Sequence, residues 1–186
     1  MPVEVHPVTP DRWDDMVTLF EQRGPRGGHR NTPAYGCWCM YWRDRALEHG
    51  EPKKRAMRAL VRDGCEPGLL AYADGEPVGW VSVAPRETFR LKGAPAGPGE
   101  VVWSISCFFV PRDRRREGLS RELIAGAVAH AKKNGATVVE AYPVDPDSPS
   151  YRHMGFIPVF AAAGFADLGM TGKRRHVMRF SIAATA

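Results

Sequence analysis

The sequence predicts an α+β fold, in which helices flank a mixed, mostly antiparallel sheet with a parallel β-α-β unit at its centre. Residues 101–110 form a β-prone run, and after a polar turn an amphipathic helix pattern extends to Asn134-Gly135. Residues 136–142 indicate another strand, which must run parallel to the first because a helix connects the two. Upstream, two short strand patterns joined by Asp74-Gly75 predict an antiparallel hairpin.

Length and composition are those of one globular domain spanning residues 1–186. Four cysteines are too few for a disulfide framework, so we expect a reduced, cytoplasmic protein. No apolar run is long enough to cross a bilayer and no secretory signal pattern opens the chain, so we expect no membrane partner. A net charge of +5 suits nucleic acid or a small polyanionic ligand, but no nucleic-acid-binding motif accompanies it. We therefore expect no nucleic acid partner.

The first elements are a strand and a helix. Residues 3–8 alternate well enough for a strand, after which Thr9 is placed to cap a helix and Pro10 to occupy its first position. The helix ends by residue 24, and residues 24–30, rich in glycine and arginine, form a loop. Its apolar positions recur at helical spacing and predict the buried face: Trp13, Met16, Val17 and Phe20.

Residues 35–43 are the most aromatic part of the chain. Cys37 and Cys39 have a spacing that can bind a metal, but no second pair of ligands at suitable spacing accompanies them, so we expect no metal site. Two interpretations remain compatible. The segment can be an apolar plug that covers the sheet, or the wall of a ligand pocket to which Arg43 also contributes.

The next elements are a helix and the hairpin. Residues 51–63 have apolar residues at helical spacing and end at Gly64. Strands at residues 69–73 and 78–83 flank the Asp-Gly turn. Residues 86–99, rich in glycine and proline, are expected to be a surface loop between strands.

The turn after the strand at 101–110 carries an unusual charge pattern. Arginines at positions 112, 114, 115 and 116 precede the helix, and Arg121 lies just inside it, where the helix dipole is already positive. The placement becomes favourable if a polyanion binds there, because backbone N–H groups and guanidinium groups then converge on phosphate oxygens. Gly118 would let the backbone approach the anion closely. A solvated basic turn or a nucleic-acid patch is the alternative.

Arg115-Arg116-Glu117-Gly118-Leu119-Ser120 resembles the Q/R-x-x-G-x-G/A signature of the GNAT family of N-acetyltransferases, whose loop holds the pyrophosphate of acetyl-coenzyme A. Ser120 stands where the family usually has Gly or Ala. The resemblance covers roughly residues 68–182 and leaves residues 24–65 as an insertion on the acceptor side. It implies that strands 101–110 and 136–142 splay apart around the pantetheine arm. The residues it implies in coenzyme binding are Phe108, Phe109, Val110, Arg115, Arg116, Glu117, Gly118, Leu119, Ser120 and Arg121.

Two Gly-Phe pairs can correspond to the family motif Y-x-x-x-G-F, whose tyrosine often protonates the departing thiolate. Tyr151 fits by letter, because it precedes Gly155-Phe156 at the right spacing. Gly164-Phe165 fits better by position, because a short helix at 157–163 should precede it and a final strand should follow. Phe160 then occupies the place of the tyrosine and cannot donate a proton. Tyr151, and less plausibly Tyr142, remain candidate donors.

The base that deprotonates the acceptor amine is the least defined part of the site. Related enzymes often place a carboxylate on the strand before the arginine-rich loop, and Glu100, at the start of that strand, is the candidate here. A covalent route through Cys107 is a minor alternative, because no activating histidine accompanies that thiol.

The resemblance implies an N-acetyltransferase that moves an acetyl group from acetyl-coenzyme A directly to a primary amine. Its partners would be the coenzyme A thioester and an amine-bearing acceptor, and a homodimer is possible. Trp38, Tyr41 and Trp42 are the candidate walls of the acceptor pocket. The alternatives are an acyltransferase acting on protein amino groups and a non-catalytic module that binds an acyl-coenzyme A.

Overall fold

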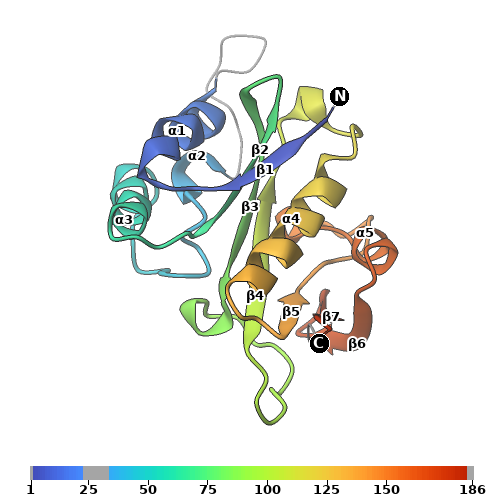
Figure 1. Cartoon of the computed structure of the whole chain (residues 1–186). Helices are drawn as coiled ribbons and strands as arrows, with labels where there is room; N and C mark the ends of the chain where they lie inside the picture. The colour runs from blue at the N-terminus through green and yellow to red at the C-terminus, as the bar shows by residue number, and fades with distance from the viewer. Residues whose placement is uncertain (1, 23–33, 184–186) are drawn as a thin grey trace.

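The computed structural model describes residues 2–22 and 34–183 and contains a seven-stranded mixed sheet (Figure 1). The strand order is β1-β2-β3-β4-β5-β7-β6, and β4 pairs with β5 in parallel while the other neighbouring pairs are antiparallel. This confirms the predicted fold class. The strands are β1 (Glu4–Pro7), β2 (Gly68–Ala73), β3 (Glu76–Pro85), β4 (Val102–Phe109), β5 (Val138–Ala141), β6 (Ala166–Thr171) and β7 (Arg175–Ser181). The loop predicted at residues 24–30 lies outside the described residues.

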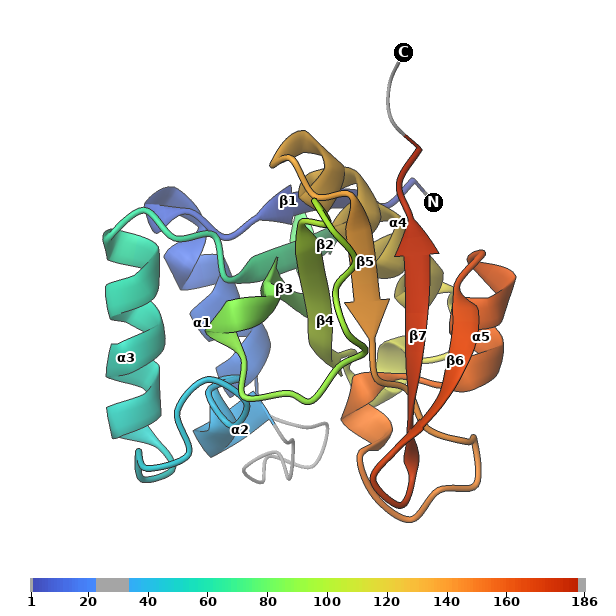
Figure 2. The same cartoon turned by 90° about the horizontal axis from the view of Figure 1, so that it is seen from below.

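Helices cover both faces of the sheet, with α4 on one face and α1 and α3 on the other (Figures 1 and 2). Each face therefore has its own apolar core, one centred on Leu123 and Ile105 and the other on Trp38 and Trp80. The α-helices are α1 (Trp13–Glu21), α2 (Ala34–Cys37), α3 (Glu51–Arg62), α4 (Leu119–Lys133) and α5 (Ile157–Ala162). Short 3-10 turns lie at Pro10–Arg12, Arg86–Thr88, Arg112–Arg114 and Arg152–Met154.

Local sequence signals predicted where the hairpin turns and where helix α4 ends. Asp74 and Gly75 both take positive φ, 52° and 81°, as a two-residue hairpin turn of the twist-compatible type requires. Asn134 caps α4, and Gly135 at φ 83° follows it, as predicted. Thr9 differs from prediction: its side chain makes no cap hydrogen bond, and its hydroxyl instead donates to Asp11 at 2.6 Å. A 3-10 turn separates it from α1, so it does not face the first α-helical N–H groups.

Strand β6 was not predicted from the sequence. It lies at one edge of the sheet, most of its residues are exposed, and its pairing with β7 is interrupted between Asp167 and Met170. An edge strand exposed on both faces needs no alternation of apolar and polar residues, so the pattern that identifies other strands is missing.

The parallel strands β4 and β5 separate part-way along their length. Their register runs from Val102↔Val138 to Ile105↔Ala141, where β5 ends while β4 continues to Phe109. Opposite β3, Val83 pairs with Ile105 and Ser82 with Cys107, so Ser106 is an extra, bulged residue at the point of separation. The second half of β4 therefore has no parallel partner strand. This is the splayed geometry that the resemblance implied.

Candidate functional site

The arginine-rich turn folds as a tight backbone bend ahead of α4. The 3-10 turn Arg112–Arg114 follows the end of β4, after which Arg116 takes φ 73° and Gly118 takes φ 82°. A left-handed conformation at a residue other than glycine costs about 1–2 kcal/mol, so the bend at Arg116 is held by its surroundings rather than by preference. Residues with positive φ that alternate with residues of negative φ direct successive backbone N–H groups to one side. Such a backbone forms a concave binding site for anions.

The first turn of α4 adds further unpaired donors to this bend. Gly118 is the N-cap residue and supplies no side-chain cap, while its carbonyl accepts from the N–H of Arg121 at 2.9 Å. Within the described residues the N–H groups of Leu119 and Ser120 have no backbone acceptor outside the helix. A Cβ built on Gly118 meets nothing within 4 Å, so the approach to these donors is open. The helix terminus thus offers backbone donors and a positive dipole to an anion.

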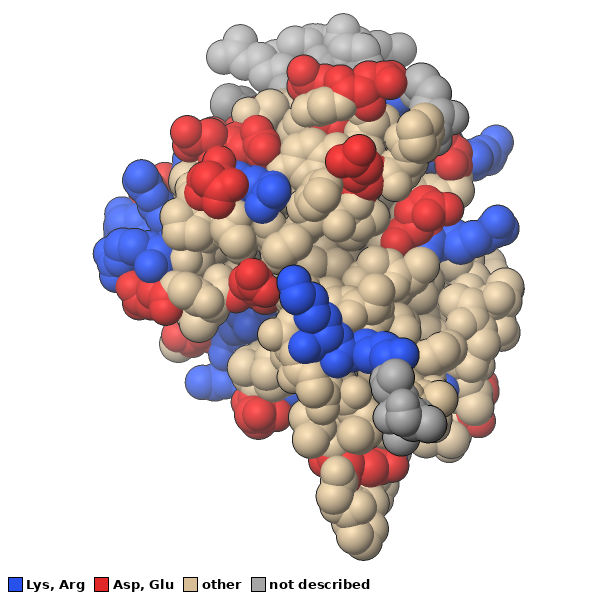
Figure 3. All heavy atoms as spheres, in the orientation of Figure 1, with Lys and Arg blue, Asp and Glu red and all other residues tan. Residues whose placement is uncertain are grey.

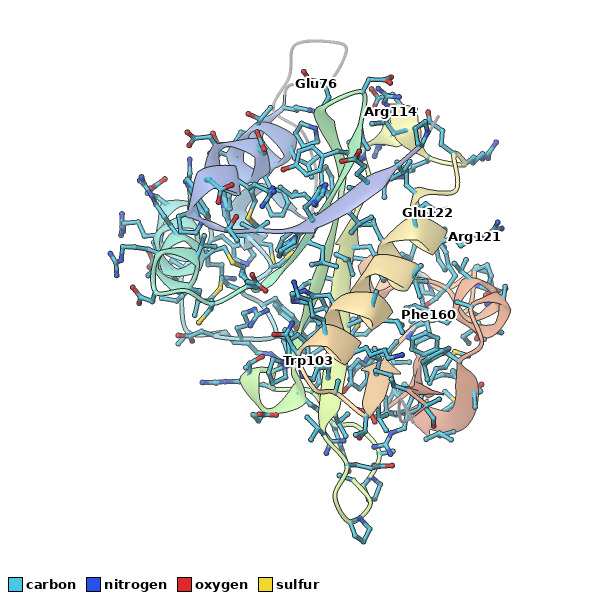
Figure 4. All side chains as sticks on the ribbon, in the orientation of Figure 1. Glu76, Trp103, Arg114, Arg121, Glu122 and Phe160 are labelled. Carbon is cyan, nitrogen blue, oxygen red and sulfur yellow. The ribbon has the colours of Figure 1, made fainter. Side chains whose placement is uncertain are left out.

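The charged side chains of the bend point mainly to solvent. Arg115, Arg116 and Arg121 are exposed, and in Figure 4 Arg121 projects outward from the first turn of α4 beside Glu122. Arg115 donates from Nε to the carbonyl of Val110 at 3.3 Å, which holds its stem against the end of β4. Glu117 lies 3.6 Å from Arg114, so this carboxylate neutralises one guanidinium and leaves the others available.

Phe108, Phe109 and Val110 lie at the end of β4 and differ in what their side chains do. Phe109 is buried against Phe20, with ring centroids 5.7 Å apart, whereas Phe108 and Val110 pack on the α4 side of the sheet. The turn Arg152–Met154 lies against β4, and a Cβ at Gly155 would meet Phe108 at 3.3 Å. The backbone edge that β5 leaves open is therefore flanked by the segment 152–155.

The second Gly-Phe pair occupies the position that the family motif predicts. Helix α5 ends at Ala162, Gly164 takes φ 88°, and β6 begins directly after Phe165. Phe160 is fully buried on α5, with its ring centroid 5.9 Å from that of Phe108 on β4 (Figure 4). An aromatic ring without a hydroxyl thus stands beside the open half of β4.

The two candidate proton donors differ in their surroundings. Tyr142 is fully buried, donates to Glu140 at 2.6 Å and lies 3.0 Å from the hydroxyl of Ser104. Burial, with the carboxylate of Glu140, raises the pKa of Tyr142, so its proton is committed to this network. Tyr151 is half-buried at φ 58°, and its ring lies 6.2 Å from Trp42. Of the two, Tyr151 therefore remains the candidate proton donor.

Glu100 lies at the opposite end of β4 from the arginine-rich bend. Its carboxylate accepts from the N–H of Gly97 at 2.8 Å and from Arg179 at 3.2 Å. It lies five positions before Ile105, where β4 and β5 part, which is about 16 Å along an extended chain. Its position therefore does not support the role of a base predicted from the sequence. The contacts indicate that Glu100 stabilises the start of β4.

The aromatic segment divides between two apolar clusters on the sheet face opposite α4. One is the core that α1 and α3 cover, and the other is a smaller, separate cluster. Trp38 is 2% exposed and packs between Trp13 and Phe20, so it belongs to the core rather than to a pocket wall. Trp42 is buried in a separate cluster with Phe89, Tyr142 and Met154, and Tyr41 is exposed beside it. Of the three predicted wall residues, only Tyr41 and Trp42 lie beyond the core that α1 and α3 cover.

The cysteines pack as thiols. Cys39 accepts from the indole N–H of Trp80 at 3.1 Å, and it takes φ 50°. The hydrogen bond with Cys39, together with burial, raises the pKa of the Cys107 thiol well above its usual value. A protonated, buried thiol is a poor nucleophile, which disfavours the covalent route. Among the residues described, no three His, Cys, Asp or Glu side chains are grouped so that they could hold a metal ion.

Several polar residues of the sheet face opposite α4 were missed by sequence reasoning. Ser106 donates to Ser82 at 3.0 Å in a buried pair, Glu140 is fully buried, and Arg175 begins β7 on this face. Serines within apolar runs are weak signals on their own. The one usable signal was the spacing of Arg175 and Arg179, which places both arginines on the same face of the last strand.

Surface charge on the α4 face is mixed. Figure 3 shows Lys and Arg side chains interspersed with Asp and Glu rather than joined in one basic stripe across the part of this face that the structure describes. None of the described helices is both long enough and apolar enough to cross a membrane.

Solved structures with the same fold support this geometry. The GNAT domain of S. lividans PAT superposes with a TM-score of 0.60 at 18% identity, over 97% of this chain and 90% of that domain. A ribosomal-protein-alanine N-acetyltransferase from Brucella melitensis gives a TM-score of 0.59 at 18% identity, over 96% and 99% of the two chains. The PaiA N-acetyltransferase from Thermoplasma acidophilum, solved with coenzyme A, gives 0.54 at 11% identity, over 98% and 100%.

Sequence comparison identifies the family. No curated protein matches the chain. Residues 33–156, more than half of the chain, match the family described as acetyltransferase (GNAT) family. The match ends at Phe156 and so includes the first Gly-Phe pair, whereas the element order favours the second. The arginine-rich bend and the whole of β4 and β5 lie inside the matched range. The chain therefore belongs to the GNAT acetyltransferase family.

Proposed function

We propose that the protein transfers an acetyl group from acetyl-coenzyme A directly to a primary amine. The observation that carries this proposal is the bend at residues 115–120, whose unpaired backbone donors and arginines lie at the end of the strand that separates from β5. The pyrophosphate would bind at this bend, through Arg115, Arg116 and the N–H groups of Gly118 to Ser120. The pantetheine arm would lie along the open edge of β4.

The thioester would then reach the point where the strands part. At Ser106 the bulged backbone can direct an N–H group at the thioester oxygen and stabilise the charge that develops on it. The attacking amine must be neutral, yet an alkylamine has a pKa of about 10.4 in water. The buried hydroxyl of Ser106, which donates to Ser82, can accept a hydrogen bond from the amine, and water takes up the amine's proton. Tyr41 and Trp42, in the described part (34–65) of the segment expected on the acceptor side, would face the acceptor.

The departing thiolate needs little help. A thiol pKa of about 8.5 lets coenzyme A leave as the anion near neutral pH, and Tyr151 is the available donor if one is used. Phe160 in the place of the family tyrosine favours a second function, a module that binds acyl-coenzyme A without turnover. The four free thiols support a reducing compartment such as the cytoplasm, and a homodimer stays a prediction.

Calorimetric titration with coenzyme A, followed by a thiol-release assay with a panel of amines, tests the proposal. We expect saturable binding and amine-dependent release of coenzyme A. Reversing the charges of Arg115 and Arg116 to Glu should weaken coenzyme binding by about tenfold or more, because charge-assisted hydrogen bonds become repulsive. The matched control reverses Arg55 and Arg58, two exposed arginines of α3, and should leave binding unchanged.

Each outcome separates the candidate functions. Binding without release in the presence of any amine would support the non-catalytic module. No binding at millimolar coenzyme A, or equal binding by both double variants, would refute the proposed site. Affinity for nucleic acid that coenzyme A does not compete for, with a steep salt dependence, would favour the nucleic-acid alternative.

A further inference from the structure

Two arginines on the sheet face opposite α4 have no carboxylate partner among residues 2–22 and 34–183. Arg43 follows Trp42 in the loop after α2, and Arg175 is the first residue of β7. Within the described residues, neither has a carboxylate oxygen within 4.0 Å, although Arg86 and Arg179 on the same face both do. Burial of an arginine without a counter-ion is unfavourable, so the pair requires an explanation.

Arg43 is held by neutral groups only. Its Nη2 donates to the carbonyl of Pro67 at 2.9 Å, and its guanidinium lies 4.3 Å from the ring centre of Phe89. Its Nε is buried and has no acceptor among the described residues. Burial lowers the pKa of Arg43 to about 10, so the group stays charged at neutral pH. A partly buried positive charge therefore lies on this face of the sheet, with one buried donor unused among the described residues.

Arg175 is half-buried and lies beside aromatic rings. Its guanidinium carbon lies 4.9 Å from the ring centre of Trp42 and 5.2 Å from that of Tyr151. In the part of the chain that the structure describes, its Nη1 is buried without an acceptor, as is the indole Nε1 of Trp42. Burial lowers the pKa of Arg175 as well. One buried donor on each of Trp42, Arg43 and Arg175 thus lacks an acceptor within the described ranges, and both guanidinium groups lie beside aromatic rings. We call these three residues the donor cluster.

Two buried or partly buried carboxylates on this face of the sheet, Glu140 and Glu100, are held by other arginines. Glu140 accepts from Arg179 Nε at 2.8 Å and lies 3.6 Å from Arg86, and Glu100 accepts from Arg179 at 3.2 Å. Neither carboxylate contacts Arg43 or Arg175, so these two guanidinium groups have no counter-ion among the described residues.

The donor cluster is connected to the strand opening. Arg43 Nη2 lies 3.5 Å from the hydroxyl of Ser82, which in turn accepts from Ser106, the bulged residue at the separation of β4 and β5. Arg175 lies three residues before Met178, which pairs with the last residue of β5, so it also lies beyond the end of β5 on the side of the opening. A molecule whose amine reaches the opening would extend its other groups toward these donors.

Resting on the acetyltransfer proposed above, we propose that the acceptor carries a carboxylate near its amine, and that Arg43, Arg175 and the indole N–H of Trp42 bind that carboxylate. A planar, singly charged carboxylate suits guanidinium donors. The apolar part of the same acceptor molecule would stack on Trp42, Phe89 and Tyr151. An amino-acid-like amine meets this description. A phosphate monoester carries about two charges and is the alternative ligand for the same donors.

Ligand binding tests this site independently of turnover. The probes are N-acetylphenylalanine, its neutral amide and phenyl phosphate, titrated calorimetrically into the protein saturated with coenzyme A. We expect the carboxylate to bind about tenfold or more tightly than the amide, because buried charge-assisted bonds discriminate strongly. Arg175→Gln and Arg43→Gln should each remove this preference. Arg174→Gln, a change at the exposed neighbouring arginine, should keep it.

Turnover gives the second measurement, with phenylalanine, phenylalaninamide and phenethylamine as acceptors in the thiol-release assay. We expect kcat/KM to be highest for phenylalanine, and Arg175→Gln to lower it for phenylalanine alone. Equal binding of N-acetylphenylalanine and its amide, or tighter binding of phenyl phosphate, would overturn the carboxylate site. Carboxylate binding without turnover of any amine would support the donor cluster and refute acetyltransfer. If Arg43→Gln fails to fold, Arg175→Gln decides the question.

Discussion

The replacement Glu140→Gln should be one of the most destabilising conservative changes in the protein. Glu140 is fully buried on β5, where its carboxylate accepts from the Tyr142 hydroxyl at 2.6 Å, from Arg179 Nε at 2.8 Å and from the N–H of Ala94 at 3.1 Å. Glutamine keeps the volume but has one acceptor oxygen and no charge. At least one donor would then face an NH₂ group, and Arg179 would lose its buried counter-ion.

The expected magnitude follows from these contacts. Removing one partner of a buried ion pair costs about 3–5 kcal/mol, because the other charge stays buried and uncompensated. That is a large part of the about 5–15 kcal/mol by which a domain is usually stable. Urea unfolding followed by circular dichroism would measure the loss as a lower midpoint with an unchanged slope.

Glu100→Gln is the matched control for this change. The side chain of Glu100 is 31% exposed and makes a longer contact with the same arginine, at 3.2 Å. Its loss should therefore cost about 1 kcal/mol or less. A loss of under about 1 kcal/mol for Glu140→Gln, or equal losses for both variants, would show that Arg179 does not depend on the buried carboxylate.

Two further changes test the packing and the titration of buried groups. Phe160→Tyr should lower the free energy of unfolding by about 1–3 kcal/mol, because the hydroxyl enters a packed apolar site. The kcat of this variant at pH 8 should barely change. A large gain in kcat would instead show that the missing acid limits turnover. Burial lowers the pKa of His130, so the unfolded chain binds its proton first and stability should fall as pH drops through 6.5. His130→Gln should reduce the difference between urea midpoints at pH 7.5 and 5.5, and an unchanged difference would contradict this assignment.

The sequence by itself determined the local elements and their order. The β-prone run at 101–110, the Asp74-Gly75 turn and the Asn134-Gly135 stop each act over a few residues, so they hold in any tertiary setting. The parallel pairing of β4 with β5 also followed, since a connecting helix leaves no other direction. The arginine-rich bend was recognisable because its charges oppose the helix dipole, which only a bound anion makes favourable.

Tertiary structure alone decided which residues meet. Glu100 and Glu140 are 40 positions apart and compete for Arg179, so the sequence could not show which carboxylate is buried. Trp38 and Trp42 differ in role because α1 covers one and a separate cluster of side chains covers the other. The donor cluster joins the loop after α2 to the start of β7 through contacts that no local pattern encodes. Which charges pair and which aromatic rings are buried depends on distances in space. The periodicity of a sequence shows only which residues share a face of one helix or strand.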